Sequence, residues 1–268
     1  PPRSTLFPYT TLFRSATDAP PPARLLVSIG EALATGGRTE EARPLLAQAL
    51  DRAGDDSALR IRIHRALSAV AAAAKDPVDA LHHAQLALAT AAGPPPAPPA
   101  EVAALCSDLA AVHLERGEIQ RAIEYGDRAM DVRRKASLTN DASAAATWIL
   151  LGRAHEAEKS HAAAALAWSN AVHDLMLTEG ANAISVGFAR TREGRAWLEA
   201  GDATQAARAL EEARLVYRIR TSAESVARAD ALLGLGEARE RLGEFAKART
   251  ALDAALVIAT AGDEACDA

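Results

Sequence analysis

The strongest constraint on the fold of this chain is a regular spacing of alanines. Ala stands at 42, 80, 122, 164, 206 and 248, and another Ala follows seven residues after each of these positions. The first interval is 38 residues and the next four are 42. Alanine fills 67 of the 268 positions, yet coincidence in all twelve slots has a probability of only about one in ten million before the choice of frame is allowed for. The pattern therefore predicts six copies of one structural unit.

Each copy has the features of a pair of packed helices. Two residues seven apart lie on nearly the same helix face, and alanine there lets a second helix come close. A small residue also stands twelve positions before each first alanine: Gly30, Ser68, Ala110, Gly152, Gly194 and Gly236. The turn between the helices is marked by Gly37, Gly117, Gly201 and Gly243, with Lys75 and Lys159 in the same slot of two repeats. Glycine relieves strain at a helix C-terminus, so we expect a helix hairpin in every copy.

These residues resemble the tetratricopeptide repeat. The Trp, Leu-Gly and aromatic spacing of that repeat is nearly met by Trp148, Leu151, Gly152 and His155. Its second-helix pattern is met by Ala164, Trp168 and Ala171, and again by Ala248, Leu252 and Ala255. The period of 42 exceeds the usual length of about 34 residues and is similar to that of kinesin light chains and of many bacterial signalling proteins. The resemblance implies an all-α, right-handed superhelical solenoid of six antiparallel helix hairpins.

The resemblance covers residues 23–262 and follows a linker at 16–22. We expect repeats near 23–56, 57–94, 99–136, 141–178, 183–220 and 223–262, with a C-terminal tail at 263–268. The prolines between 94 and 99 could separate two sub-arrays, but a loop between helices is also due there, and we favour the loop. Asn140-Asp141 and Thr221-Ser222 are plausible N-caps of first helices.

The first fifteen residues, PPRSTLFPYTTLFRS, differ in composition from all that follows and contain no alanine. Residues 5–15 match the translation of a sequencing adapter residue for residue, so we interpret 1–15 as a non-native tail to be left out of fold reasoning. The chain does not begin with Met, and its first Met is Met130. We therefore expect the native N-terminus, and any targeting signal in it, to be missing.

The fifth repeat departs from the pattern of the family. Arg190 and Glu193 stand where Trp and Leu are expected. They could form a buried ion pair, which is costly unless it is well hydrogen-bonded. Alternatively, the helix could be rotated so that the charges are partly exposed, and we favour this second interpretation.

Residues that could carry catalysis or metal binding form no recognisable constellation. His82 and His83 are adjacent and point to different helix faces, and Gly234-Leu235-Gly236 lacks the third glycine of a phosphate-binding loop. His113 and His155 fill the aromatic slot of successive repeats, where we expect structural histidines that stack on each other. Cys106 is interpreted as a small core residue. We expect no enzyme activity, no cofactor and no metal.

Charge and hydropathy bear on the class of partner. The net charge is −5 with no long run of like charge, so we expect no nucleic-acid partner. No apolar stretch approaches the roughly 18 residues of a membrane span, so no membrane partner is expected. The two cysteines match no metal or redox spacing, which favours a cytoplasmic protein.

In the tetratricopeptide family, the first helix of each hairpin lines a groove for ligands. We call the side of these first helices that points away from the packed small residues the open face. It supplies the candidate contacts Arg62, Arg65, Ser107, Ile149, Arg153, Phe188, Thr191 and Arg195, followed by the acidic Asp230, Glu237 and Glu240. Arginine can hold a carboxylate by two hydrogen bonds, so an acidic peptide is the expected ligand. The resulting hypothesis is a protein- or peptide-binding scaffold that belongs to a larger bacterial signalling or regulatory protein. The alternative is a free-standing peptide-sensing regulator.

Overall fold

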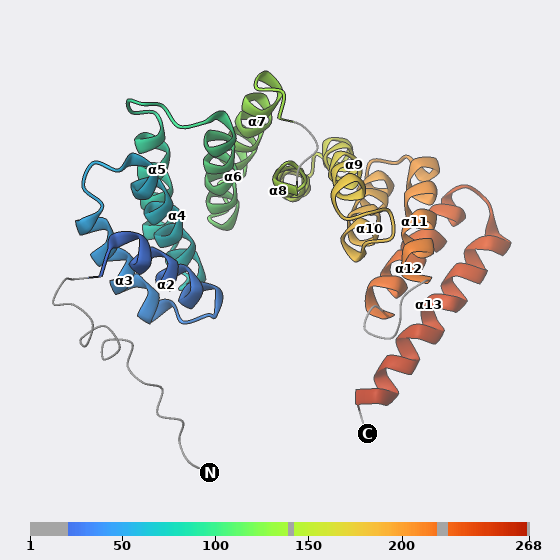
Figure 1. Cartoon of the computed structure of the whole chain (residues 1–268). Coiled ribbons are helices and arrows are strands. Elements are labelled where there is room, and N and C mark those ends of the chain that lie inside the picture. The colour runs from blue at the N-terminus through green and yellow to red at the C-terminus, as the bar shows by residue number, and fades with distance from the viewer. Residues whose placement is uncertain (1–20, 139–141, 219–224, 267–268) are drawn as a thin grey trace, which may run out of the picture. The chain divides into compact units, whose positions relative to one another are not determined.

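The computed structural model describes residues 21–138, 142–218 and 225–266. All regular structure in these residues is helical, and none of it is strand (Figure 1). The expected tail at 1–15 and the expected N-caps at 140–141 and 221–222 lie outside the described residues. The helices are α2 (Ala23–Thr35), α3 (Thr39–Arg52), α4 (Ser57–Ala73), α5 (Pro77–Ala91), α6 (Pro99–Glu115), α7 (Ile119–Lys135), α8 (Ala142–Glu158), α9 (His161–Thr178), α10 (Ile184–Glu199), α11 (Ala203–Arg218), α12 (Ser225–Arg241) and α13 (Phe245–Cys266).

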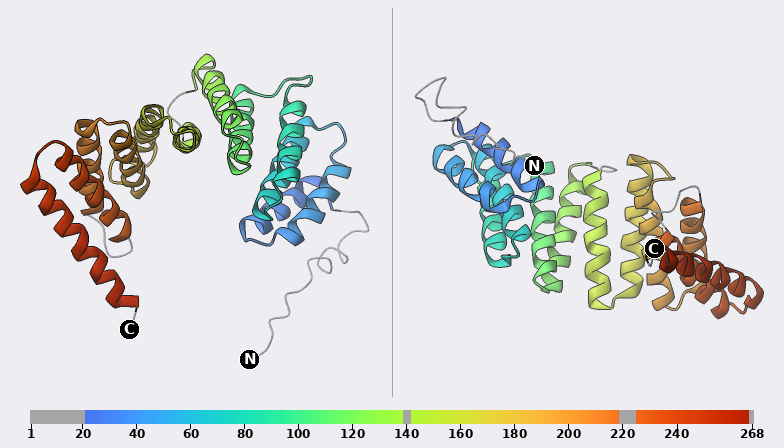
Figure 2. Two further views of the ribbon diagram at one scale, coloured as in Figure 1. Left: turned by 180° about the vertical axis from the view of Figure 1, so that it is seen from behind. Right: turned by 90° about the horizontal axis from the view of Figure 1, so that it is seen from below.

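The chain divides into two compact units between Ala97 and Pro98, within the proline-rich connection. The first unit contains the hairpins α2–α3 and α4–α5, and the second contains α6–α7, α8–α9, α10–α11 and α12–α13. Within each unit the two helices of a hairpin run antiparallel and pack together, and each hairpin packs on the next (Figure 2). The expected all-α array of antiparallel hairpins is confirmed.

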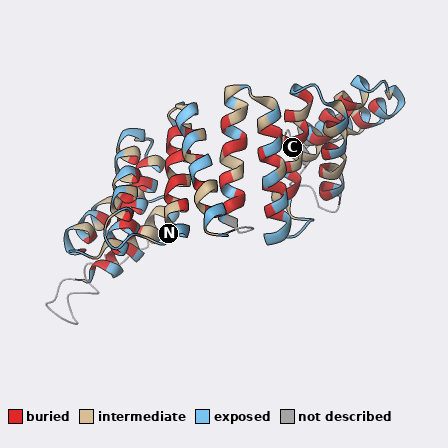
Figure 3. Cartoon of the chain, turned by 90° about the horizontal axis from the view of Figure 1, so that it is seen from above, coloured by how far each residue is buried: buried red, intermediate tan, exposed pale blue. Residues whose placement is uncertain are grey.

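The alanines that repeat along the sequence form the close contacts between helices. All twelve are buried, with exposed fractions between 0% and 8%. Buried residues accordingly follow the sides of the helices that face their neighbours, and exposed residues cover the outside (Figure 3). Alanine suits these positions because it adds little bulk between two backbones and is also the best helix former.

A small residue on the first helix of a hairpin faces a larger one, sixteen residues later, on the second helix. A Cβ added at Gly30, Gly152, Gly194 or Gly236 would come within 2.9 Å of a side-chain atom of Leu46, Trp168, Leu210 or Leu252, respectively. Where the first helix instead has Ser68 or Ala110, the residue sixteen later is the smaller Ala84 or Gly126. A Cβ at Gly126 would meet Leu151 of the next hairpin at 2.7 Å, so that side chain occupies the space. A large side chain on one helix thus faces a small residue on the other.

The turns inside the hairpins share one backbone geometry. Lys75 and Lys159 have φ of 60° and 65°, close to the 73° of Gly117 at the same repeat position. In the fourth hairpin the amide of Ser160 donates to the carbonyl of His155, and that of Lys159 donates to Glu156, which is a Schellman ending. The prediction that these two lysines occupy a glycine-type turn position is confirmed.

The fifth hairpin corrects the interpretation of Arg190 and Glu193. Glu193 is 1% exposed, and its Oε2 lies 2.7 Å from Nη1 of Arg190. Arg190 also pairs with Glu212 of α11 at 2.8 Å. Helix α10 therefore places the Glu193 carboxylate inside the protein, and the half-buried Arg190 bridges it to the exposed Glu212.

The last helix is longer than the repeat pattern indicates. Helix α13 runs from Phe245 to Cys266, past the expected repeat end at residue 262. The expected tail at 263–268 therefore begins as a continuation of this helix.

Candidate binding surface

The candidate contact residues belong to both units. Arg62 and Arg65 lie on α4 of the first unit, and Ser107 lies on α6 of the second. The other five lie on α8 and α10 of the second unit: Ile149, Arg153, Phe188, Thr191 and Arg195. We therefore describe the two groups separately.

In the first unit, Arg62 already has an acidic partner. Its Nε donates to Oε1 of Glu31 on α2 at 2.8 Å, and a second guanidinium nitrogen pairs with the other carboxylate oxygen. The hydrogen bond to Glu31 raises the pKa of Arg62 above its ordinary value. Arg65 is exposed on the same helix. A ligand carboxylate at Arg62 would have to displace Glu31.

In the second unit, Arg195 is held by two carboxylates of α12. Its Nη2 lies 2.6 Å from Oδ1 of Asp230, and its Nη1 lies 3.0 Å from Oε2 of Glu237. Burial lowers the pKa of Arg195, but the hydrogen bonds and charges of Asp230 and Glu237 outweigh burial and raise it. The acidic end of the face therefore neutralises one of the arginines that was expected to bind a ligand.

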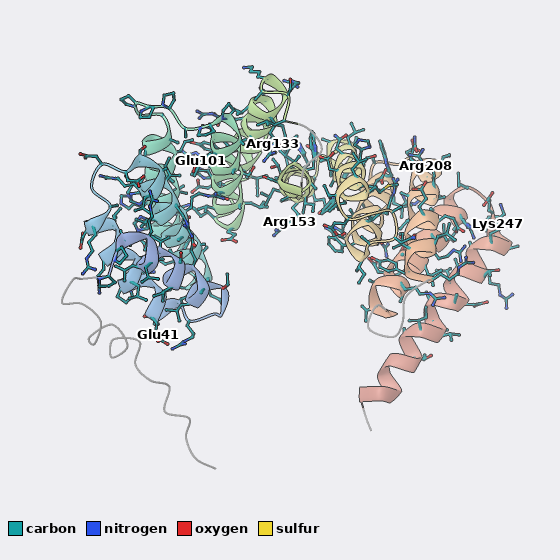
Figure 4. All side chains as sticks on the ribbon, in the orientation of Figure 1. Glu41, Glu101, Arg133, Arg153, Arg208 and Lys247 are labelled. Atoms are coloured by element: carbon teal, nitrogen blue, oxygen red, sulfur yellow. The ribbon has the colours of Figure 1, made fainter. Side chains whose placement is uncertain are left out.

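Arg153 differs from the other arginines of this face. It is exposed on α8 and has no hydrogen bond or ion pair to another described residue. Figure 4 shows it projecting from α8. The repeat explains why: the equivalent residues on the flanking first helices, 42 positions away, are Ala111 and Arg195, and neither can pair with a guanidinium. The guanidinium of Arg153 is therefore exposed to solvent and not bonded to another described residue.

Two hydroxyl residues turn inward instead of lining the open face. Thr191 was expected on the surface, but it is 4% exposed, and its hydroxyl donates to the carbonyl of Gly187 at 2.9 Å. This local bond satisfies the hydroxyl inside the protein, which removes Thr191 from the contact set. The half-buried Ser107 shares a 2.7 Å hydrogen bond with Thr147, which is itself buried on α8. That bond links two neighbouring first helices.

The open face of α10 and α12 carries exposed apolar side chains. Ile184 and Phe188 on α10 are 44% and 49% exposed, and Val226 and Leu233 on α12 are 81% and 43% exposed. We call these four residues the α10–α12 apolar patch. The spacings of four and seven residues place each pair on one helix face. The two helices pack together, and the bonds of Arg195 to Asp230 and Glu237 bring these faces side by side.

Three residues of this patch escaped the sequence analysis. Phe188 was identified, whereas Ile184, Val226 and Leu233 were not. The signal was present, because Ile184 and Val226 are 42 residues apart and so occupy the same repeat position. Reading each position across all the repeats would have found them.

Phe188 sits on a rigid support. Its ring meets the indole of Trp168 edge to face, with 5.9 Å between centroids. Trp168 is fully buried, and its Nε1 donates to Glu156 at 2.9 Å. Arg192 pairs with the same Glu156 and lies over the indole at 5.9 Å from the centroid. The exposed phenyl ring is thus held in place by its packing on Trp168.

The residues considered for chemistry have structural surroundings. His113 stacks on Tyr125 with 5.2 Å between ring centroids, and its Nδ1 lies 2.8 Å from Glu118. It therefore does not stack on His155, which lies near Glu158 instead. Burial raises the pKa of the Cys106 thiol, so its nucleophilic thiolate is disfavoured. Across residues 21–138, 142–218 and 225–266, no three His, Cys, Asp or Glu side chains are arranged to hold a metal ion.

The helices of the described residues do not meet the requirements of a membrane span. Each one is too short or too polar to pass through the hydrocarbon layer.

The comparisons with known proteins agree with this architecture. A family model described as "Tetratricopeptide repeat" matches residues 11–58 and 191–264. Among the curated proteins, none matches the sequence. The two matched segments are similar to the tetratricopeptide repeat, and the solved structures described next share the fold.

Three solved structures illustrate the shared fold. BtubC (BKLC) from P. vanneervenii has a TM-score of 0.68 and 19% identity, over 88% of this chain and 92% of that one. A signal transduction ATPase with numerous domains and a tetratricopeptide repeat sensor, from Pyrococcus horikoshii, has a TM-score of 0.75 and 13% identity, over 88% and 36%. The apo quorum sensor NprR from B. thuringiensis has a TM-score of 0.61 and 11% identity, over 94% and 70%. At these identities the likeness is one of fold.

Proposed function

We propose that the chain is a non-catalytic scaffold that binds a protein or peptide segment on the first-helix face of its second unit. The observation that carries this proposal is the α10–α12 apolar patch. Ile184, Phe188, Val226 and Leu233 expose apolar surface on two adjacent helices. Removing such surface from water contributes roughly 25 cal/mol per Å². A partner that covers the patch would gain this contribution without distorting the helices.

The charges beside the patch favour a ligand with an acidic group next to apolar ones. Arg153 on α8 can receive a carboxylate through its planar fork. Arg195 would first have to release Asp230 and Glu237, so it is the weaker anchor of the two. The partner we propose is therefore an acidic protein or peptide segment, held by Arg153 and by the exposed ring of Phe188.

The wider setting we propose is bacterial signalling. One structure with this fold is described as a sensor within a larger ATPase, and another as a quorum sensor. By this analogy, the chain serves as the recognition part of a larger cytoplasmic regulator. The alternative is a free-standing peptide sensor. Neither role involves nucleic acid or a membrane.

A screen with matched variants tests the binding surface. Peptides selected from a random display library on the parent chain are measured against Ile184→Ser and Phe188→Ser. The control is Leu166→Ser on α9, because Leu166 is 57% exposed but lies on a second helix. We expect the two α10 variants to bind at least about tenfold more weakly, a loss of about 1.4 kcal/mol each. Parent-like affinity in both α10 variants, or an equal loss in the control, would place the site elsewhere.

A further inference from the structure

The first unit contains a close pair of histidines that the proposed binding function does not use. His64 of α4 is 3% exposed, and its Nδ1 lies 3.2 Å from Nδ1 of His83 on α5. The two rings stack, with 5.3 Å between centroids and 29° between planes. The side chain of His83 is 16% exposed. This contact joins the two helices of one hairpin.

The distance between the two nitrogens requires a single proton between them. Oδ1 of Asp79 lies 3.6 Å from Nε2 of His83, which favours a proton on that nitrogen and leaves Nδ1 of His83 as the acceptor. His64 then donates from its Nδ1. A proton added to His83 can be accommodated, because His64 can shift its own proton to Nε2 and accept instead. A second added proton puts N–H groups on both facing nitrogens, and the hydrogen bond is lost.

The other charges around the pair are mainly positive. His82 of α5 lies against His83, with 5.4 Å between ring centroids, and Arg60 of α4 acts on His64. Arg43 of α3 acts on His83 and pairs with Asp79 at 3.2 Å, so it offsets the acid that faces His83. Burial, reinforced by the charge of His83, lowers the pKa of His64 to about 4. Burial likewise lowers the pKa of His83, and Asp79 opposes this shift.

We propose that the His64–His83 pair is an acid-sensitive latch in the first unit: it closes the α4–α5 hairpin while it carries at most one added proton, and it releases the hairpin when both rings are charged. The direction of the pH effect follows from proton binding. Below the ordinary histidine pKa of about 6.5, the two histidines bind protons in the unfolded chain that they do not bind in the folded pair. The first unit therefore loses stability as the pH falls from about 6.5 towards 4.

The positions of the tryptophans allow the two units to be observed separately. All three, Trp148, Trp168 and Trp197, lie in the second unit, so their fluorescence reports on that unit and far-ultraviolet circular dichroism reports on both. Between pH 7 and pH 5 we expect the midpoint of the circular-dichroism melt to fall by roughly 5 °C more than the fluorescence midpoint. Equal falls in the two signals would overturn the latch.

Two variants distinguish the effect of the His64–His83 pair on stability from the effects of other titrating groups. The double variant His64→Phe, His83→Gln keeps a ring at position 64 and a polar side chain at position 83 but removes both titrating groups, and we expect it to lose most of the additional fall. His82→Gln removes one neighbouring positive charge but leaves the pair intact, so it should keep most of the additional fall. An undiminished fall in the double variant contradicts the proposal. If the double variant does not fold, the parent is titrated and followed by NMR of the histidine side-chain nitrogens. Two separated protonation steps, the second below about pH 5, support the latch. Independent titration of both rings near pH 6.5 overturns it.

Discussion

Gly152 lies directly against the indole of Trp168, so a Cβ at position 152 would come within 2.8 Å of Cε2 and 2.9 Å of Nε1. The indole cannot move aside, because Trp168 is fully buried and its Nε1 is hydrogen-bonded to Glu156. The fourth hairpin can therefore hold a tryptophan only where the facing helix has no side chain.

Gly152→Ala should destabilise the chain by about 1–3 kcal/mol, since the added methyl group forces α8 away from α9. Urea unfolding followed by far-ultraviolet circular dichroism, which reports on both units, measures the change. Gly36→Ala is the control, because a Cβ there would approach only the carbonyl oxygens of Ala32 and Leu33, at 3.4 and 3.5 Å. If both variants unfold at the parent's urea concentration, the close packing inferred at Gly152 is wrong.

The turn positions should respond to substitution through the backbone alone. Lys159 has φ of 65°, which costs a residue with a side chain about 1–2 kcal/mol, so Lys159→Gly should stabilise the chain by up to that amount. Gly201 has φ of 87° and open space around the missing Cβ, so Gly201→Ala should destabilise it by a similar amount. Thermal melts of the two variants should shift in opposite directions. A shift in the same direction would mean that side-chain contacts dominate these turns.

The buried pair in the fifth hairpin should be sensitive to the loss of one partner. Glu193→Ala should cost about 1–3 kcal/mol, less than for a fully enclosed pair, because Arg190 keeps its bond to Glu212. Replacing both residues with leucine should recover most of this loss, since a hydrophobic pair fills the space without desolvating charges. A double-mutant cycle by urea unfolding measures both effects. A neutral Glu193→Ala would show that the carboxylate is not buried.

Arg153 and Arg195 should contribute to different properties. Arg195→Ala removes two ion pairs between α10 and α12 and should cost about 1–2 kcal/mol of stability. Arg153→Ala should change stability by less than about 0.5 kcal/mol, because no described residue bonds to it. For an acidic peptide selected on the parent chain, Arg153→Glu should weaken binding, and added salt should reduce the difference between variant and parent. Unchanged peptide affinity in Arg153→Glu would exclude it as the anchor.

The hairpins could be predicted from the sequence because their close contacts depend on residue size at fixed intervals. Ala164 and Gly152 mark such contacts whatever surrounds them. In contrast, whether a charged side chain is paired or buried depends on residues of neighbouring helices. Arg195 was expected to be available, but it is neutralised by Asp230 and Glu237, which are 35 and 42 residues away. The burial of Glu193 likewise requires Arg190 and Glu212 to converge, which no single-helix pattern reveals.

The alternation of large and small residues between facing helices also fixes the order in which the hairpins can follow one another. Gly126 of the third hairpin has its vacant space filled by Leu151 of the fourth, whereas the corresponding residue of the fifth hairpin is Glu193. Moving the fifth hairpin into the fourth place would therefore set a carboxylate against the space at Gly126. The repeats share one backbone plan but are not interchangeable modules, so shuffling them would disrupt the array even though every hairpin kept its own internal contacts.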